Sequence, residues 1–320
     1  MPGFFFFARA RALAAAASAA ALNRSFRMPE LADRATLLLC LGFWAMVHSP
    51  INCGAPDRPT RKLRTMPHDL ARTSPLTRTL LAPNAGPMTL EGTNSYVIGA
   101  SEAGPIVVVD PGPLDEGHLA ALAAVGPIEL VLVTHRHPDH SAASVRFAKL
   151  TGAPVRAFDA AYCVNGDPLV GGELIAAAGT GIRVVHTPGH TDDSVCLHLP
   201  GDGPTGSVLT GDTILGRGTS IIDGTLADYL TSLDALRALG PATVLPAHGP
   251  VLPDLAAICA AYLAHRRERL DQVRAALATL GSDASVGQVT DSVYAQADAA
   301  VRFAAEASVR AQLAYLRGEA

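Results

Sequence analysis

The stretch ELVLVTHRHPDH (residues 129–140) decides how this 320-residue chain is interpreted. Its apolar first half predicts a buried strand, so three histidines and an aspartate gather where that strand ends. Alternation along an extended chain places His135 and His137 on one side, where two imidazoles can share one metal ion. Asp139 and His140 begin the next turn and face a neighbouring position. The stretch therefore predicts a metal site that offers two ligands to each of two ions.

Two ligands are half of what such an ion needs, because Zn²⁺ usually has about four ligands, one of them water at catalytic sites. Three further residues of the right type stand at predicted strand ends. They are His190 in the turn TPGHT (187–191), Asp212 at the end of SVLTGD (207–212) and His248 at the end of ATVLPAH (242–248). Functional side chains usually lie in such turns. These residues are therefore candidates to complete both half-sites.

Short runs rich in β-branched residues alternate with amphipathic segments from about residue 88. Strands are predicted at 95–100, 105–110, 129–135, 154–158, 182–187, 194–199, 207–212 and 242–248. Helical spacing is found over 114–124, 141–150 and 227–239, which is typical of a layered α/β domain. After Pro253 the pattern is helical, with a long helix over 254–279 and two more over 285–318. We predict a metal-binding domain at 66–253 and a helical domain at 254–320.

The formal net charge of −4 averages two unlike segments. Residues 1–65 hold nine basic and three acidic residues, net +6, which leaves 16 basic and 26 acidic residues, net −10, for 66–320. An apolar stretch at 35–47 is shorter than the roughly 20 residues that span a bilayer, and its setting does not fit a signal peptide. We expect residues 1–65 to be a disordered extension or an over-long start, without stable membrane insertion.

The cysteines of the chain do not form a disulfide pattern. They are odd in number and lack C-x-x-C spacing: Cys40, Cys53, Cys163, Cys196 and Cys259. Free thiols are typical of a reducing compartment, so we expect a cytoplasmic protein.

Residues 135–140, the TPGHT turn, GDTILG (211–216) and PAHGP (246–250) resemble the metallo-β-lactamase superfamily in its binuclear hydrolase branch, over about residues 78–318. The resemblance implies an α/β fold, a four-layer αββα sandwich with a metal site at one edge, followed by a helical tail. It implies two divalent ions, by default Zn²⁺, and a metal-bridging hydroxide oriented by the catalytic residues Asp139 and Asp212. The implied ligands are His135, His137 and His190 for one ion, Asp139, His140 and His248 for the other, and Asp212 bridging both.

Three longer stretches, at 84–96, 211–219 and 248–251, are similar to the β-lactamase-like protein 2 group, whose animal members are endoribonucleases. That group follows its metal domain with a winged-helix-like tail, which 261–274 and 308–316 resemble. The chain ends at Ala320, where a wing would follow, so we expect the wing to be missing. RNA binding through a wing is correspondingly disfavoured.

Several substrate classes follow from the resemblance. A phosphodiester in single-stranded RNA, but not DNA, ranks first, although the acidic body opposes polyanion binding without a local basic patch. A thioester or other acyl ester ranks second, as in the glyoxalase II branch, because no lysine follows Lys149 to form a lysine-rich thiol-conjugate site. β-Lactam hydrolysis ranks low, because those enzymes generally lack the bridging aspartate. A non-catalytic binding protein is disfavoured by the complete ligand set, and a diiron electron-transfer protein by His137, where those relatives have glutamate.

Other charged residues allow two interpretations. Arg217 and the run Arg266, Arg267, Arg269 and Arg274 could bind phosphates, or could be helix-surface residues paired with Glu268 and Asp271. Asp110 could accept a hydrogen bond from a ligand histidine or form a turn. Asp192 and Asp193 are similarly open between capping a helix and supporting a ligand.

The remaining histidines are expected to be structural. Their predicted settings are strand packing for His186 and His198, solvated helix surfaces for His118 and His265, and positions outside the pattern for His48 and His68.

Overall fold

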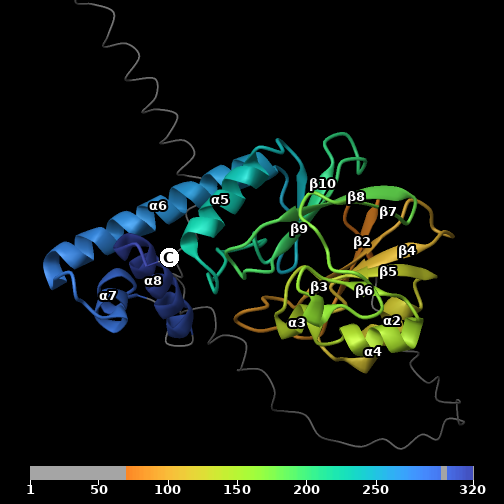
Figure 1. Cartoon of the computed structure of the whole chain (residues 1–320), viewed down its shortest axis with the longest axis horizontal. Helices are drawn as coiled ribbons and strands as arrows, with labels where there is room; N and C mark the ends of the chain where they lie inside the picture. Colours follow the sequence, from red (N-terminus) through yellow and green to blue (C-terminus); the bar gives the residue numbers. More distant parts are fainter. Residues whose placement is uncertain (1–69, 297–300, 320) are drawn as a thin grey trace, which may run out of the picture. The chain divides into compact units, whose positions relative to one another are not determined.

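The structure is a computed structural model that describes residues 70–296 and 301–319. Its strands form two mixed sheets (Figure 1). The first has the order β1 (Ala71–Arg72), β2 (Thr77–Leu81), β3 (Asn94–Ile98), β4 (Ile106–Val109), β5 (Ile128–Leu132) and β6 (Val155–Arg156). The second has the order β11 (Thr243–Pro246), β10 (Ser207–Gly211), β9 (Val195–Leu199), β8 (Thr180–His186) and β7 (Leu174–Ala177). The extension expected at 1–65 and His48 and His68 lie outside the described residues.

The two sheets pack face to face, and helices cover their outer faces. Between the sheets lies one apolar cluster that includes Val107 and Leu132 from the first sheet and Leu197 and Leu209 from the second. Helices α2 (Glu116–Ala123) and α4 (Ser144–Thr151) cover the first sheet, and α5 (Leu226–Arg237) and α6 (Leu255–Leu280) cover the second. The molecule therefore has the predicted αββα sandwich, with each apolar layer removed from water.

The eight predicted strands are all present, with bounds shifted by a few residues. The sequence pattern missed β1, β2 and β7. Two of these strands lack an apolar pattern. In β7, exposed leucine and alanine alternate with buried residues over only four positions, and β2 contains three polar residues. Such short or mixed runs lack the continuous apolar character of a central strand.

Three helices follow the second sheet, as predicted. Helix α6 is succeeded by α7 (Val286–Val293) and α8 (Arg302–Arg317), and the three share an apolar cluster around Val273, Val289 and Val309. A capping box formed by Ser285 and Gln288 starts α7. Within 70–296 and 301–319, each helix is too short or too polar to cross a membrane. The domain boundary at 253 remains a prediction, since α6 packs into the same cluster as α5.

Candidate metal centre

The seven predicted ligands lie together at one edge of the sandwich. They come from four chain segments that follow strands: His135, His137, Asp139 and His140 after β5, with the last two in α3 (Pro138–Ser141); His190 in the turn between β8 and β9; Asp212 after β10; and His248 after β11. The parallel pairs β4–β5 and β10–β11 aim their carboxyl ends at this edge. Residues distant in sequence therefore meet because the strands that carry them end in one place.

Three imidazoles form the first group. Nδ1 of His137 lies 3.1 Å from Nε2 of His135 and 3.0 Å from Nε2 of His190, and the two Nε2 atoms are 3.2 Å apart. Nitrogens bound about 2.0–2.1 Å from one tetrahedral Zn²⁺ would be about 3.3 Å apart, so this triangle has the size that one ion requires. A carboxylate oxygen of Asp212 joins the same group.

Asp139, His140 and His248 form the second group. Oδ2 of Asp139 lies 3.3 Å from Nε2 of His140 and 3.2 Å from Nε2 of His248. Asp212 faces both groups, since its Oδ1 is 3.3 Å from Nε2 of His248 while its Oδ2 is 3.7 Å from Nε2 of His190. One carboxylate therefore connects two candidate ion positions.

The buried histidines turn the same nitrogen toward the centre. Nδ1 of His190 donates to the Ile221 carbonyl at 2.8 Å, and Nδ1 of His248 donates to the Gly92 carbonyl at 3.1 Å. Nδ1 of His140 donates to Asp110 at 2.9 Å. Each Nε2 is thereby left facing the carboxylates, which is the tautomer and orientation that metal-ligating histidines require.

Two polar atoms at the centre provide a test of fit. Nε2 of His140 and Oδ1 of Asp212 are buried, and within the described residues neither has a hydrogen-bond partner. Leaving such atoms unsatisfied costs about 1–3 kcal/mol each. A divalent cation between imidazole and carboxylate would satisfy both atoms at once, so these residues fit a pair of divalent ions.

In the absence of ions, paired charges stabilise the cluster. Burial raises the pKa of Asp212, but the positive charges of His140 and His248 outweigh it and hold that pKa well below its usual value. Burial likewise raises the pKa of Asp139, and the neighbouring His140 and His248 lower it further than burial raises it. Burial lowers the pKa of His248, but Asp139 and Asp212 raise it to about 9. Burial keeps the pKa of His135 well below 6.5.

The raised pKa of His248 predicts a pH dependence for the metal-free protein. Its folded value of about 9 exceeds the ordinary 6.5, so its contribution is fully present below about pH 6.5 and is lost as the pH rises through 9. Denaturant unfolding of chelated protein should therefore show a free energy of unfolding that falls by a few kcal/mol between about pH 7 and pH 10. His248→Gln should flatten this decline, and a stability that rises over the same interval would contradict it.

Comparison with known proteins agrees with this arrangement. The family model described as metallo-beta-lactamase superfamily matches residues 88–248, which contain both groups. The chain belongs to the metallo-β-lactamase superfamily. It is a hydrolase of that superfamily with the fold and the seven-residue cluster described above.

Three similar proteins illustrate the relationship. An atrochrysone carboxyl ACP thioesterase of Aspergillus aculeatus is 32% identical over 69% of this chain and 71% of its own length. A beta-lactamase-like protein 2 homolog of Drosophila melanogaster is 32% identical over 61% of this chain and 71% of its own. A crystal structure of a metallo-beta-lactamase family protein from Thermus thermophilus superposes with a TM-score of 0.64 at 25% identity, covering 77% of this chain and 94% of the other.

Asp110 supports two histidines of the superfamily site. Its carboxylate accepts from the amide and the hydroxyl of Thr134, both at 2.7 Å, as well as from His140. The Thr134 oxygen lies 3.1 Å from Nδ1 of His135 and can accept a hydrogen bond from it, because the threonine hydroxyl itself donates to Asp110. Asp110 has a φ of 51°, in the left-handed region that non-glycine residues rarely adopt. Of the two interpretations that the sequence left open for Asp110, the acceptor of a histidine N–H is therefore present.

Two further contacts were not evident from the sequence. Thr93 lies with its hydroxyl 3.3 Å from Asp139, and the Asn84 side chain bonds both the amide and the hydroxyl of Thr93 at 2.8 Å. Gly189, with a φ of 134°, lets the turn before His190 lie against α5, where an added Cβ would come within 2.4 Å of the Tyr229 backbone. Only glycine tolerates both the conformation and the close approach.

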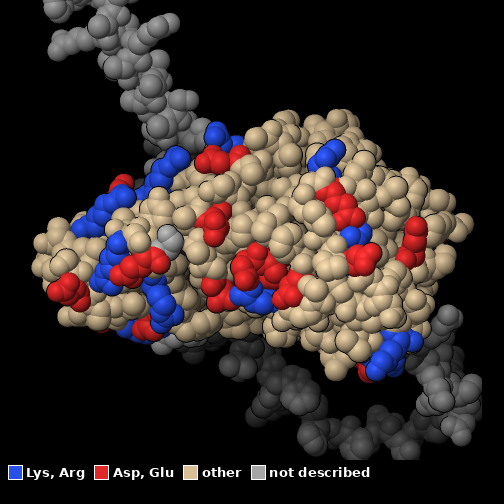
Figure 2. Space-filling view, viewed as in Figure 1, with Lys and Arg blue, Asp and Glu red and all other residues tan. Residues whose placement is uncertain are grey.

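The arginines of the run on α6 lie in different environments. Arg266 is 3% exposed, which contradicts a helix-surface position, because its guanidinium lies over the Tyr229 ring in the core. Arg274 pairs with Asp271 at 2.6 Å, as one interpretation predicted, and Arg217 pairs with Glu91 at 2.6 Å. On the face drawn in Figure 2, basic and acidic side chains are interspersed along this part of the molecule.

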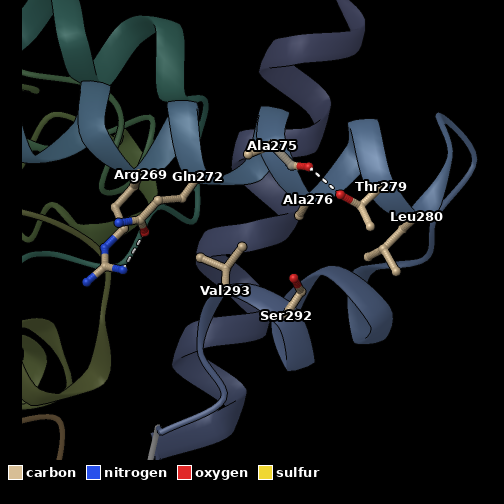
Figure 3. Close-up of a pocket in the computed structure, with 8 residues that line it drawn as sticks. All are labelled: Arg269, Gln272, Ala275, Ala276, Thr279, Leu280, Ser292 and Val293. Atoms are coloured by element: carbon tan, nitrogen blue, oxygen red, sulfur yellow. Dashed lines mark hydrogen bonds between the residues drawn. The ribbon is translucent and has the colours of Figure 1, made fainter.

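Arg269 lines a cavity of about 450 Å³ between α6 and α7 (Figure 3). Its guanidinium donates to Gln272 at 2.7 Å and lies 5.0 Å from the Tyr294 ring centroid. Most of the remaining wall is small or apolar, including Ala275, Ala276 and Val293. The cavity is thus lined by C-terminal residues and by none of the seven cluster residues.

Asp192 and Asp193 cap no helix and instead pair with Arg136. His186 packs against Phe158 with ring centroids 3.9 Å apart, as expected, and His198 is half-buried in β9.

His118 corrects one expectation and His265 is intermediate. Predicted to be solvated, His118 is buried with Nε2 2.8 Å from the Ser95 hydroxyl, because the start of α2 turns toward the sheet. His265, also predicted to be solvated, is half-buried on α6.

Proposed function

We propose that this hydrolase is binuclear and metal-dependent, and that it cleaves an acyl thioester or related acyl ester. His135, His137 and His190 would hold one divalent ion, Asp139, His140 and His248 the second, and Asp212 both, with Zn²⁺ favoured by the imidazole-rich set. When bound, two such ions lower the pKa of water toward neutrality and stabilise the charge that develops on the substrate oxygen. The convergence of seven ligating side chains carries the metal dependence.

The side chains around the ions have separate tasks. The carboxylates of Asp139 and Asp212 can accept hydrogen bonds from the attacking water and orient it toward the carbonyl carbon. Asp110 and the Ile221 carbonyl hold imidazoles in position, so little reorganisation is required during reaction. After attack, the tetrahedral oxyanion collapses, the carbon–sulfur or carbon–oxygen bond breaks, and the proton lost by the attacking water ends on the expelled thiolate or alkoxide or in solvent.

The charge beside the site favours an acyl substrate over a polyanion. Arg136 directly follows His135, but its guanidinium pairs with Asp192, Asp193 and Asp223. Asp223 is 53% exposed and lies 3.7 Å from Nε2 of His137, so the rim has an excess of negative charge. Phosphodiester chains bind through unpaired lysines and arginines, which this rim does not supply. The similar Aspergillus protein named as an acyl carrier protein thioesterase supports the same substrate class.

An endoribonuclease-like activity is the second candidate. It is favoured by the similarity to beta-lactamase-like protein 2 homologs, of which the Drosophila protein is 32% identical. The sequence motifs favour RNA cleavage over thioester hydrolysis. We place thioester hydrolysis first because Arg136, the arginine beside the site, is paired with aspartates and does not offer a free charge to a phosphate.

A parallel assay distinguishes the two candidates. We expect metal-loaded full-length protein to hydrolyse S-lactoylglutathione or an acyl-pantetheine thioester at least about 100-fold faster than chelated protein, and to leave single-stranded RNA uncut. Thiol release and labelled RNA on a gel are the measurements. RNA cleavage that chelation removes, together with inert thioesters, would overturn the acyl assignment.

We further propose a cytoplasmic location. Cys163, Cys196 and Cys259 are free, and burial raises the pKa of the Cys196 thiol to about 11, as expected of unreactive thiols in a reducing compartment.

A further inference from the structure

Helix α6 places a buried cation against the loop that runs from Asp212 to Gly224. Arg266 lies midway along α6, is 3% exposed and is one of the least accessible charged residues of the described chain. A buried guanidinium is costly unless its N–H groups and charge are compensated. The contacts that compensate Arg266 therefore indicate what the residue does.

The guanidinium of Arg266 has two kinds of partner, while its Nε is buried without a hydrogen-bond partner among the described residues. Nη2 donates a hydrogen bond to the backbone carbonyl of Ser220. The guanidinium carbon lies 5.0 Å from the centroid of the Tyr229 ring, which provides a cation–π contact in the core. Arg266 thus attaches α6 to one residue of the loop and to α5 behind it.

Ser220 and the residue after it contact a candidate ligand directly. The Ser220 hydroxyl lies 3.0 Å from Nδ1 of His190, and the Ile221 carbonyl accepts from the same nitrogen at 2.8 Å. The amides of Asp223 and Gly224 donate to the His190 carbonyl. The loop therefore determines both the position and the ring orientation of His190.

A second side chain of α6 holds the other end of the loop. Tyr262, one helical turn before Arg266, donates to the carbonyls of Leu215 or Gly218 at 3.1 and 2.9 Å. It also accepts from the Leu215 amide at 3.1 Å. Residues four apart lie on one face of a helix, so a single face of α6 contacts the loop at both Leu215 and Ser220.

We propose that Arg266 and Tyr262 are positioning residues for the metal centre, and that the C-terminal helix is part of the machinery that forms it. The inference rests on the proposed metal dependence. Arg266 acts through Ser220 and Ile221 on His190, while Tyr262 supports the segment that follows Asp212. Metal affinity should accordingly depend on residues of α6 that contact no ligand.

The test compares metal binding by full-length variants. Arg266→Met retains much of the apolar volume but removes the donor to Ser220. It should weaken binding of the ion that His135, His137 and His190 would hold by about 10–100-fold, the usual effect of losing a group that orients a ligand. Arg266→Lys retains a donor and should restore part of the affinity. Arg267→Met, at the exposed neighbouring position, is the matched control and should bind as the wild type does.

Affinity is measured by chelator competition with Zn²⁺, and ligand geometry by the visible spectrum of the Co²⁺-loaded protein. Thermal unfolding of the chelated variants separates loss of fold from loss of the site. If Arg266→Met does not fold, Tyr262→Phe provides the same test, because it removes only the hydroxyl and should alter the Co²⁺ spectrum and weaken binding severalfold.

The outcomes separate this inference from the proposed function. A wild-type protein that binds fewer than two ions would contradict the proposed function itself. Wild-type stoichiometry of two, together with unchanged affinity and an unchanged Co²⁺ spectrum in folded Arg266→Met or Tyr262→Phe, would overturn the positioning role alone, even if the variants were less stable.

Discussion

Asp212→Ala should lower kcat/KM for thioester hydrolysis by on the order of 10³-fold, because it removes the carboxylate that faces both ion positions. The variant leaves His140 and His248 near each other without one of the negative charges that balance them. The affinity for the ions should decrease, and the attacking water should be less well oriented. Kinetics at saturating Zn²⁺, together with metal analysis, separate these two losses.

The matched control is Asp234→Ala. Asp234 is an exposed aspartate on α5 that pairs with Arg237 at 2.9 Å and lies outside the metal cluster. Its replacement should leave kcat/KM within about twofold of the wild type, since exposed ion pairs contribute little to stability. Activity of metal-loaded Asp212→Ala close to the control would contradict the assignment of Asp212 as a shared ligand.

Removal of the ions should abolish hydrolysis and lower the melting temperature by about 8–16 °C. An ion present at 1,000 times its dissociation constant stabilises the folded state by about 4 kcal/mol, and each kcal/mol corresponds to about 2–4 °C for a domain of this size. Calorimetry of loaded and chelated protein measures the shift, and thiol release measures the activity.

The metal-free protein should nevertheless remain folded, because Asp139 and Asp212 pair with His140 and His248 in the absence of ions. Adding Zn²⁺ back should then restore both activity and melting temperature. His137→Ala, which removes one nitrogen of the triangle, should reduce the metal-dependent shift. An identical melting temperature with and without ions, in protein shown to have lost them, would refute a metal contribution to stability.

Most of the fold could be predicted from local sequence. The central strand β4 is fully buried, and its sequence is accordingly a continuous apolar run. Strand β7 escaped prediction because it lies at the edge of the second sheet, where alternate residues are exposed and the apolar signal is weak.

The candidate ligands could be predicted for a related reason. Each stands where a strand ends, and strands of one sandwich bring their ends to a common edge. The residue types needed for metal binding are few, so their repeated occurrence at strand ends indicated the site before any contact was known.

The burial of individual polar side chains could not be predicted in the same way. Arg266 has the sequence setting of a surface helix residue, yet it is buried against Tyr229 because α5 lies alongside α6. His118 is buried for a similar reason, with Ser95 of the first sheet as its partner. In both cases the deciding neighbour is distant in sequence.

The sequence by itself determined the layered fold, the seven candidate ligands and the kind of ion they suit, since these depend on residue type and on periodicity within single elements. The tertiary structure alone decided that Asp110 orients His140, and that α6 supports the loop beside His190. Each of these is a contact between segments brought together by packing. Their distances and protonation depend on neighbours that no local pattern specifies.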